Sequence, residues 1–283
     1  MFRKWSGLWP FVLISVIFCP ELLAQSSQPT TGILFNTLMI RNGHDAGTMF
    51  AVQVDNREYW LTAKHILTGR KSGPAGEVKE KEISLQVLDP VGTDIKWDEV
   101  KFKVIDPGKD VDIVVLVPTT TLTRSDIQPL KISSERFEFG DECSFLGYPF
   151  AQTWMATFKD YVFKMPYIKH CYISGMIQQP VKVLVLDGIN NPGFSGGPVL
   201  YKTGPNQVVI GVISGYHSEP GQVHSIEVPN DSTAVQMPKN TKVKHTGKES
   251  VVDLNTGIII AYIAEPIVDA VRTNPIGQPL HQK

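Results

Sequence analysis

The sequence predicts an all-β protein built from two six-stranded antiparallel β-barrels and a short C-terminal helix. Short apolar runs rich in β-branched residues recur along the 283 residues, separated by glycine, proline and asparagine. No long segment has the apolar spacing of an amphipathic helix. The runs fall into two groups, divided by a polar connector over residues 118–141. Such a pattern is typical of strands that close into barrels.

The first group of runs covers about residues 33–117. Asn42-Gly43 is a turn signal after the first run, and Asp55-Asn56-Arg57 joins the next two runs into a hairpin. Residues 69–81 are polar and are expected to form a loop. The six expected strands are Ile33–Ile40, Thr48–Val54, Glu58–Ala63, Ile83–Leu88, Val100–Ile105 and Asp112–Val117.

The second group covers about residues 142–265. Pro266 then opens a helix over residues 266–272, because proline suits a first helical turn, where its missing N–H is not needed. Residues 274–283 are expected to be a tail. The six expected strands are Cys143–Tyr148, Cys171–Ile177, Val181–Leu186, Pro198–Tyr201, Val208–Ser214 and Gly257–Ile263.

Two segments of the second group look inserted. Residues 149–170 carry several aromatic side chains and are expected to be a loop packed on itself, with a substrate or partner surface as the alternative. Residues 218–256 are polar, contain several lysines, and are expected to be a mobile flap.

The N-terminus has the layout of a secretory signal peptide. Basic Arg3 and Lys4 precede an apolar run from Leu8 to Cys19, and Ala24 offers a cleavage site. We therefore expect residues 1–24 to be a signal peptide, residues 25–32 a disordered lead-in, and the mature protein to be periplasmic or extracellular. An uncleaved membrane anchor is the competing interpretation. No later run is long or apolar enough to span a bilayer, so stable membrane insertion is not expected.

The composition is that of an ordinary globular protein. Hydrophobic residues make up 42 % and charged residues 19 %, and the formal net charge is −1. This balance gives no electrostatic reason to expect nucleic acid as a partner. After cleavage only Cys143 and Cys171 remain, and either a disulfide or two buried thiols would fit. The oligomeric state stays open.

A candidate nucleophile, Ser195, lies in the glycine-rich turn Asn191–Pro198. Little side-chain bulk surrounds it, and the N–H groups of Gly193 and Ser195 can turn toward one point to stabilise an oxyanion. His65 follows a strand-like run, and imidazole titrates near neutrality, as a general base requires. Asp112 begins another apolar run and is preferred over Asp110 as the acid that orients His65.

Three blocks of sequence carry a resemblance to a known family. Thr62–His65, Asp112–Leu116 and Gly193–Pro198 resemble the catalytic blocks of the trypsin-like (chymotrypsin-fold) serine peptidases, over about residues 33–273. Asn-Pro-Gly-x-Ser-Gly-Gly-Pro is similar to the bacterial HtrA-type branch, although too little chain follows the helix for a PDZ domain. The resemblance implies an endopeptidase with Ser195 as nucleophile, His65 as base and Asp112 as orienting acid.

The resemblance also implies a substrate site. Ile189, six residues before the nucleophile, would form the base of the primary specificity pocket, and its apolar side chain favours cleavage after small or medium aliphatic residues. Ile213, Ser214, Gly215 and Tyr216 would flank the bound substrate strand, with Ile258 and Ile260 on the opposing strand.

One position departs from the animal members of the family. Phe194 stands where those members carry an aspartate that binds a new N-terminal amine after zymogen cleavage. Activation of that kind is therefore not expected here.

Other functions fit the sequence less well. A catalytically inert binding or chaperone-like member of the same fold is the main alternative to a peptidase of polypeptide substrates. The chain order His, Asp, Ser disfavours an α/β-hydrolase esterase. There is no His-Glu-x-x-His motif and no phosphate- or dinucleotide-binding loop, so neither a metal nor another cofactor is expected.

Overall fold

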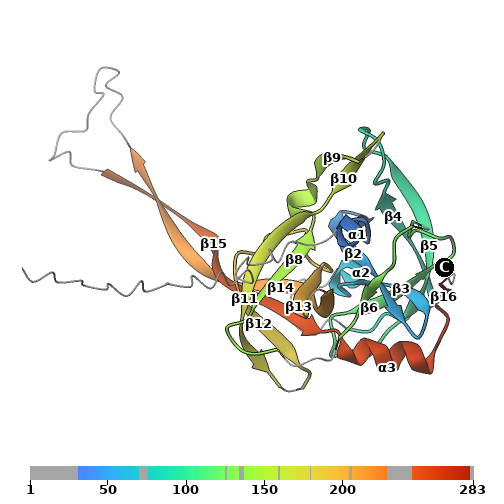
Figure 1. Ribbon diagram of the computed structural model, residues 1–283. Coiled ribbons are helices and arrows are strands. Elements are labelled where there is room, and N and C mark those ends of the chain that lie inside the picture. The colour runs from blue at the N-terminus through green and yellow to red at the C-terminus, as the bar shows by residue number, and fades with distance from the viewer. Residues whose placement is uncertain are drawn as a thin grey trace, which may run out of the picture.

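A computed structural model describes residues 31–69, 76–124, 126–133, 137–158, 160–178, 180–203, 206–227 and 244–280. It confirms the all-β prediction, with two rings of strands side by side and a helix near the C-terminus (Figure 1). The segment expected to be a signal peptide lies outside the described residues. No helix in the described part of the chain is long and apolar enough to cross a membrane.

Barrel one is a closed ring of six antiparallel strands. Neighbours in the ring follow the order β3-β6-β5-β4-β1-β2, and β2 pairs with β3 to close it. Two short strands add to its edges: β7 (Leu130–Lys131) pairs with β2, and β16 (Gln278–Pro279) pairs with β3. The ring strands are β1 (Thr37–Asn42), β2 (Asp45–Val54), β3 (Arg57–Thr62), β4 (Glu82–Leu88), β5 (Trp97–Ile105) and β6 (Val114–Pro118).

Barrel two is a second closed ring of six antiparallel strands, in the order β11-β12-β15-β14-β13-β8. Its strands β14 and β15 run on past the barrel and project from the body as a two-stranded arm (Figure 1). The segment expected to be a flap is therefore ordered strand in its described parts. The ring strands are β8 (Glu142–Gly147), β11 (Tyr167–Ile177), β12 (Val183–Asp187), β13 (Pro198–Thr203), β14 (Asn206–Glu227) and β15 (Lys244–Ile263).

Three clusters of buried side chains form the main core. One fills barrel one around Trp60 and Phe102, and another fills barrel two around Phe145 and Phe194. The third lies between the barrels and combines residues of both with Ile267 and Val271 of helix α3 (Glu265–Thr273). Apolar burial therefore fixes the position of one barrel against the other as well as each barrel's own shape.

The start of barrel one differs from the prediction. Residues Thr31–Phe35 form a short helix, α1, and the strand begins only at Thr37. Asn36 donates its backbone N–H to Gly32 O, and the Thr37 hydroxyl donates to Ile33 O, so local hydrogen bonds end the helical turn. Ile33 is buried in the core between the barrels, which explains why this apolar residue belongs to no strand.

The aromatic insertion is not a loop. After a 3₁₀ turn, η1 (Pro149–Ala151), it forms a hairpin of β9 (Trp154–Phe158) and β10 (Tyr161–Met165). Strand β10 docks on barrel one, since Lys164 donates its N–H to Pro90 O and its Nζ to Asp89 O and Val91 O. The expectation of a self-packed loop was wrong because this segment packs on residues far earlier in the chain. Lys164 and Asp89, which are in contact, lie 75 positions apart.

Cys143 and Cys171 are both free and buried. They are direct partners in the β8–β11 register, with their Sγ atoms 3.0 Å apart. The hydrogen bond between them, together with burial, raises the pKa of the Cys171 thiol far above its usual range. The sequence had left a disulfide and two thiols as alternatives, and the structure has the thiols.

Candidate active site

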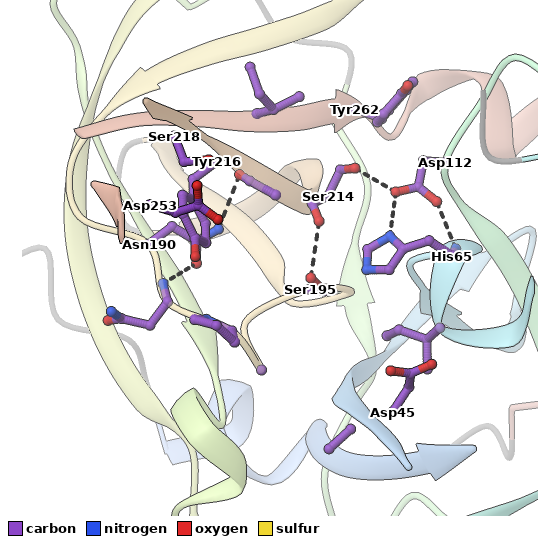
Figure 2. A pocket seen from close by; sticks show the side chains of 17 residues that line it. Asp45, His65, Asp112, Asn190, Ser195, Ser214, Tyr216, Ser218, Asp253 and Tyr262 are labelled. Atoms are coloured by element: carbon purple, nitrogen blue, oxygen red, sulfur yellow. Dashed lines mark hydrogen bonds and ion pairs between the residues drawn. The ribbon is translucent and has the colours of Figure 1, made fainter. Parts of the chain in front are cut away.

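A cleft of about 700 Å³ is lined by residues from both barrels. His65 and Asp112 come from barrel one, while Gly193, Ser195 and Ser214 come from barrel two (Figure 2). The structure thus brings the three sequence blocks to one place, on opposite sides of the junction between the barrels.

His65 and Asp112 are held together by the pairing of the strands next to them. Strands β3 and β6 are partners, so the residues after β3 and before β6 lie at the same end of the sheet. His65 opens helix α2 (His65–Thr68) instead of ending the strand, and Asp112 precedes β6 by a short stretch instead of beginning it. Asp110, the rival acid, is exposed.

The Asp112 carboxylate is buried and accepts from three donors. Its Oδ1 accepts the backbone N–H of His65 at 2.9 Å, and its Oδ2 lies 2.7 Å from His65 Nδ1. The Ser214 hydroxyl also donates to Oδ2. The bond to Nδ1 leaves Nε2 as the nitrogen of His65 that is free to take a proton.

Lys64 joins the His65 turn to the loop that leads into Asp112. Its side chain is fully buried, its Nζ lies 2.6 Å from Asp106 Oδ1, and it also donates to Gly108 O. Burying both charges is favourable only when geometry and hydrogen bonding are good, as they are here. This ion pair therefore ties the approach to Asp112 to the residue next to His65.

Ser195 is positioned by contacts between its turn and strand β2. Thr48 donates its N–H to Ser195 O and its hydroxyl to Gly193 O, both at 2.8 Å. The Ser195 hydroxyl donates to Ser214 O at 3.0 Å, and no hydrogen bond joins it to His65. In enzymes without substrate such a bond is often long or poorly aligned, and it tightens only in the complex with substrate.

The backbone at Gly193 adopts a conformation that is open to glycine and strained for other residues. Pro192 O accepts the N–H of Phe150 at 2.7 Å, so the N–H of Gly193 on the other side of the same trans peptide points away from Phe150. Gly193 has φ of 102°, and a Cβ there would lie 2.1 Å from Tyr148 O. Glycine is thus required at this position for both conformation and space.

The structure places some of the residues expected to bind substrate in the cleft and others outside it. Ser214, Gly215, Tyr216 and Ile260 line the cleft. Ile213 is fully buried in the core of barrel two and does not line the cleft.

Ile189 and Ile258 are 53 % and 41 % exposed and do not line the cleft. The physical reason for the position of Ile213 lies in a register shift of β14 between Ile213 and Gly215, since one extra residue changes which face a side chain occupies.

Sequence reasoning missed Asn190, which is 1 % exposed and lines the cleft in the place expected for Ile189. Its Nδ2 donates to Gly215 O at 3.1 Å, and its Oδ1 accepts the N–H of Asn191. Asn255 donates to its backbone oxygen. The only local signal is that asparagine follows Ile189 in a turn, where an amide often binds the backbone.

Two other side chains of the cleft also escaped notice. Asp253, on the arm, lines the cleft near Tyr216 and Ser218 (Figure 2). Tyr262 lines it as well, and burial, with the charges of Asp112 and Asp110, raises the pKa of its hydroxyl, which therefore stays protonated. Within the described residues no group of His, Cys, Asp and Glu side chains is arranged to hold a metal ion.

Comparison with known proteins places the chain in a family. Residues 47–212 match the family model of the trypsin-like peptidase domain. No curated protein sequence matches the chain.

Solved structures with the same fold include the HtrA-type protease AlgW with a tripeptide, at 15% identity and a TM-score of 0.50. That match covers 87% of this chain and 61% of AlgW. The active form of the Rv3671c protease from M. tuberculosis has 15% identity, a TM-score of 0.47, and coverage of 90% of this chain and 91% of its own.

The protease Anisep from Arthrobacter nicotinovorans has 13% identity, a TM-score of 0.49, and coverage of 86% and 96%. At 15% identity the match to AlgW speaks to the fold alone. The family model, which spans more than half of the chain, goes further. The chain belongs to the trypsin-like peptidase family and is a serine endopeptidase.

Proposed function

We propose that this endopeptidase cleaves polypeptides through an acyl-enzyme formed on Ser195, with His65 as general base and Asp112 as the acid that orients it. The observation that carries the proposal is the shared cleft, in which the bonded pair His65–Asp112 faces the Ser195 turn and the glycine backbone beside it. A serine hydroxyl needs such a base to react at neutral pH.

The reaction starts when the Ser195 hydroxyl leaves Ser214 O and donates to His65 Nε2. His65 takes the proton as Ser195 Oγ attacks the scissile carbonyl, and the N–H groups of Gly193 and Ser195 receive the developing oxyanion. The imidazolium is stabilised by Asp112, which stays ionised. The His65 imidazolium then protonates the leaving amine. Water, activated by His65 in the same way, attacks the acyl-enzyme and releases the acid product.

Substrate would bind as an extra strand along β14. The pairing of β13 with β14 ends at Val212, and the backbone of Ser214, Gly215 and Tyr216 continues along the cleft without β13 as a neighbour. Ser214 O already faces the Ser195 hydroxyl. An extended peptide adding to this edge would present its carbonyl to Ser195.

The proposed enzyme prefers to cleave after small or medium aliphatic residues, which lie on the acyl side of the scissile bond. Tyr216 and Ile260 line the cleft, and the uncharged amide of Asn190 takes the place expected for the base of the pocket. A peptide-library digest read by mass spectrometry tests this preference. Dominant cleavage after Lys or Arg would contradict it and would point to Asp253 as the specificity residue.

Export is proposed on the sequence of residues 1–24 alone. Expression in a bacterial host followed by N-terminal sequencing of the secreted or periplasmic chain is the test, with Gln25 expected as the new first residue. Recovery of the whole chain in the membrane fraction would favour the uncleaved anchor.

The activity itself is tested with a fluorophosphonate, which reacts only with an activated serine. We expect labelling at Ser195 that is abolished in Ser195→Ala and strongly reduced in His65→Ala. Circular dichroism of each variant confirms folding. A folded wild-type chain that stays unlabelled would support the inert, binding-only alternative, for which the Ser195–Ser214 hydrogen bond is the one structural argument.

A further inference from the structure

Lys169 makes three contacts with the segment that carries Ser195. It lies on β11, opposite Phe145 of β8. Its Nζ donates to Ile189 O at 2.7 Å and to Asn191 Oδ1 at 2.6 Å. The same ammonium stands 5.4 Å from the centre of the Phe194 ring. All three partners belong to residues 189–195, the turn that also provides Gly193 and the nucleophile.

These contacts add to the interactions that hold the turn from its other sides. Thr48 holds Ser195 and Gly193 from the side of barrel one, and the Phe194 ring is buried among the core residues of barrel two. The ammonium of Lys169 is a single group that contacts both the start of the turn, at Ile189 O, and the Phe194 ring. An ammonium that donates to two oxygens and lies over an aromatic face gains from charge-assisted hydrogen bonds and from cation–π attraction.

We propose that Lys169 is a positioning residue that holds the turn 189–195 in its reactive arrangement, so that the oxyanion site exists without proteolytic activation. This inference rests on the proposed function. Phe194 occupies the position at which an aspartate would capture a new N-terminal amine, and here the cation comes instead from a neighbouring strand and binds neutral oxygens. Lys169 touches neither substrate nor reacting atoms in this account.

The charge on Lys169 can be tested by pH because burial lowers the pKa of its ammonium. The titratable groups on its own face of β11 are the Tyr167 hydroxyl and the Cys171 thiol, with the thiol of Cys143 opposite on β8, and the turn 189–195 adds no carboxylate. His170 faces the other side of the strand and pairs with Glu142, and Asp187 of β12 lies opposite Tyr172, also on that side.

Among the described residues no carboxylate forms a salt bridge with Lys169. Burial alone disfavours the cation, so the turn keeps its charge-assisted hydrogen bonds and the contact with the Phe194 ring only while Lys169 is protonated. Raising the pH removes the cation, weakens these contacts and should loosen the turn. Activity is then lost on the alkaline side. Arginine stays charged throughout this range and can bind two acceptors, so Lys169→Arg should move that loss to higher pH.

The experiment compares Lys169→Met and Lys169→Arg with the wild type. Lys164→Met is the control, because the Lys164 ammonium likewise donates to two neutral oxygens, but in a fully buried position at the contact of β10 with barrel one. Each protein is assayed for the second-order rate of fluorophosphonate labelling, for kcat and KM on a peptide substrate across pH, and for its Tm.

We expect Lys169→Met to lower kcat and the labelling rate by about 10- to 100-fold, somewhat less than the loss of one oxyanion donor, with KM little changed. Lys169→Arg should keep most of the activity and extend it to higher pH. Lys164→Met should lower Tm without these kinetic changes.

The inference is overturned if Lys169→Met labels at the wild-type rate. It is also overturned if Lys164→Met, at a similar fall in Tm, loses as much kcat and labelling rate as Lys169→Met. An alkaline limb that is the same in wild type and Lys169→Arg also overturns it. A folded wild type that does not label at all instead overturns the proposed function on which the inference rests.

Discussion

Both oxygens of the Asp112 carboxylate accept hydrogen bonds, so even a change from carboxylate to amide is expected to disturb the site. Asp112→Asn would replace one acceptor with an NH₂ group that faces the Nδ1–H of His65 or the Ser214 hydroxyl. His65 would be driven to the wrong tautomer. We expect kcat to fall about 10⁴-fold, the loss known for this substitution in trypsin-like triads, while Tm changes modestly.

The control is Asp110→Asn, since Asp110 is exposed and close in sequence. It should retain nearly full activity in the same assay. If Asp110→Asn were the more damaging of the two, Asp110 and not Asp112 would be the orienting acid.

Gly193 permits a second prediction at the scale of one residue. In Gly193→Ala the new methyl group would meet Tyr148 O, and the residue would also have to hold a positive φ. The turn must shift, so fluorophosphonate labelling should drop by at least about 10²-fold, the scale of one lost oxyanion donor. Gly175→Ala is the control, because its Cβ would meet only Val185 at 3.9 Å. Equal labelling of both variants would show that the Gly193 backbone is not needed.

Single residues also show where sequence reasoning reaches its limit. The motifs pointed to His65, Asp112 and Ser195, which the structure brings into one cleft, because those motifs depend on local backbone chemistry. Counting residues did not locate the pocket: Ile213 is in the core, and Asn190 takes the place expected for Ile189. A bulge in β14 and the amide bond to Gly215 O set that outcome, and neither has a local sequence signature.

At the scale of elements, the ring strands were predictable because alternation and turn residues are local signals. The hairpin β9–β10 was missed because its buried side chains, such as Phe163, pack on residues far away in the sequence. The lengths of β14 and β15 were missed because polar residues in an exposed two-stranded arm carry no apolar alternation.

The buried pair Lys64–Asp106 gives a prediction about how elements are joined. Lys64→Met leaves the Asp106 carboxylate facing a buried site without its cation, and we expect unfolding free energy to fall by about 3–5 kcal/mol. Lys64→Met with Asp106→Leu removes both charges and should recover most of that loss. Urea unfolding in a Ser195→Ala background, which prevents self-digestion, measures both.

Activity then separates stability from geometry. If the pair only stabilises the fold, the double variant with Ser195 intact should regain both Tm and kcat. We expect it to regain Tm but not kcat, because the loop before Asp112 would no longer be tied to the residue beside His65. Full recovery of kcat would contradict this view.

At the scale of the whole molecule, the last elements connect the two barrels. Helix α3 follows barrel two, yet Arg272 pairs with Asp55 of barrel one at 2.9 Å. Beyond it β16 pairs with β3, Arg57 donates to Gly277 O at 2.8 Å, and Leu280 donates its N–H to Asn56 O. The predicted tail is thus partly a strand of the other barrel.

Removing residues 275–283 tests this connection. The truncated chain loses the bonds at Gly277, Gln278 and Leu280, and each such hydrogen bond contributes about 0.5–1.5 kcal/mol. We expect a fall of about 1–4 kcal/mol in unfolding free energy in the Ser195→Ala background. A chain ending at Leu280 should unfold like the full chain, and equal stability of all three would show that β16 contributes nothing.

The return of α3 and β16 to barrel one also sets a time order for the newly made chain. His65, Asp112 and Ser195 all leave the ribosome before Ile267, Val271 and Gln278, which complete the core between the barrels and the edge of β3. At about 5–20 residues per second, the final segment arrives several seconds after the nucleophile. The cleft between the barrels therefore takes its final form only after residues 265–280 have been made, and the proposed site is expected to stay inactive in a shorter nascent chain.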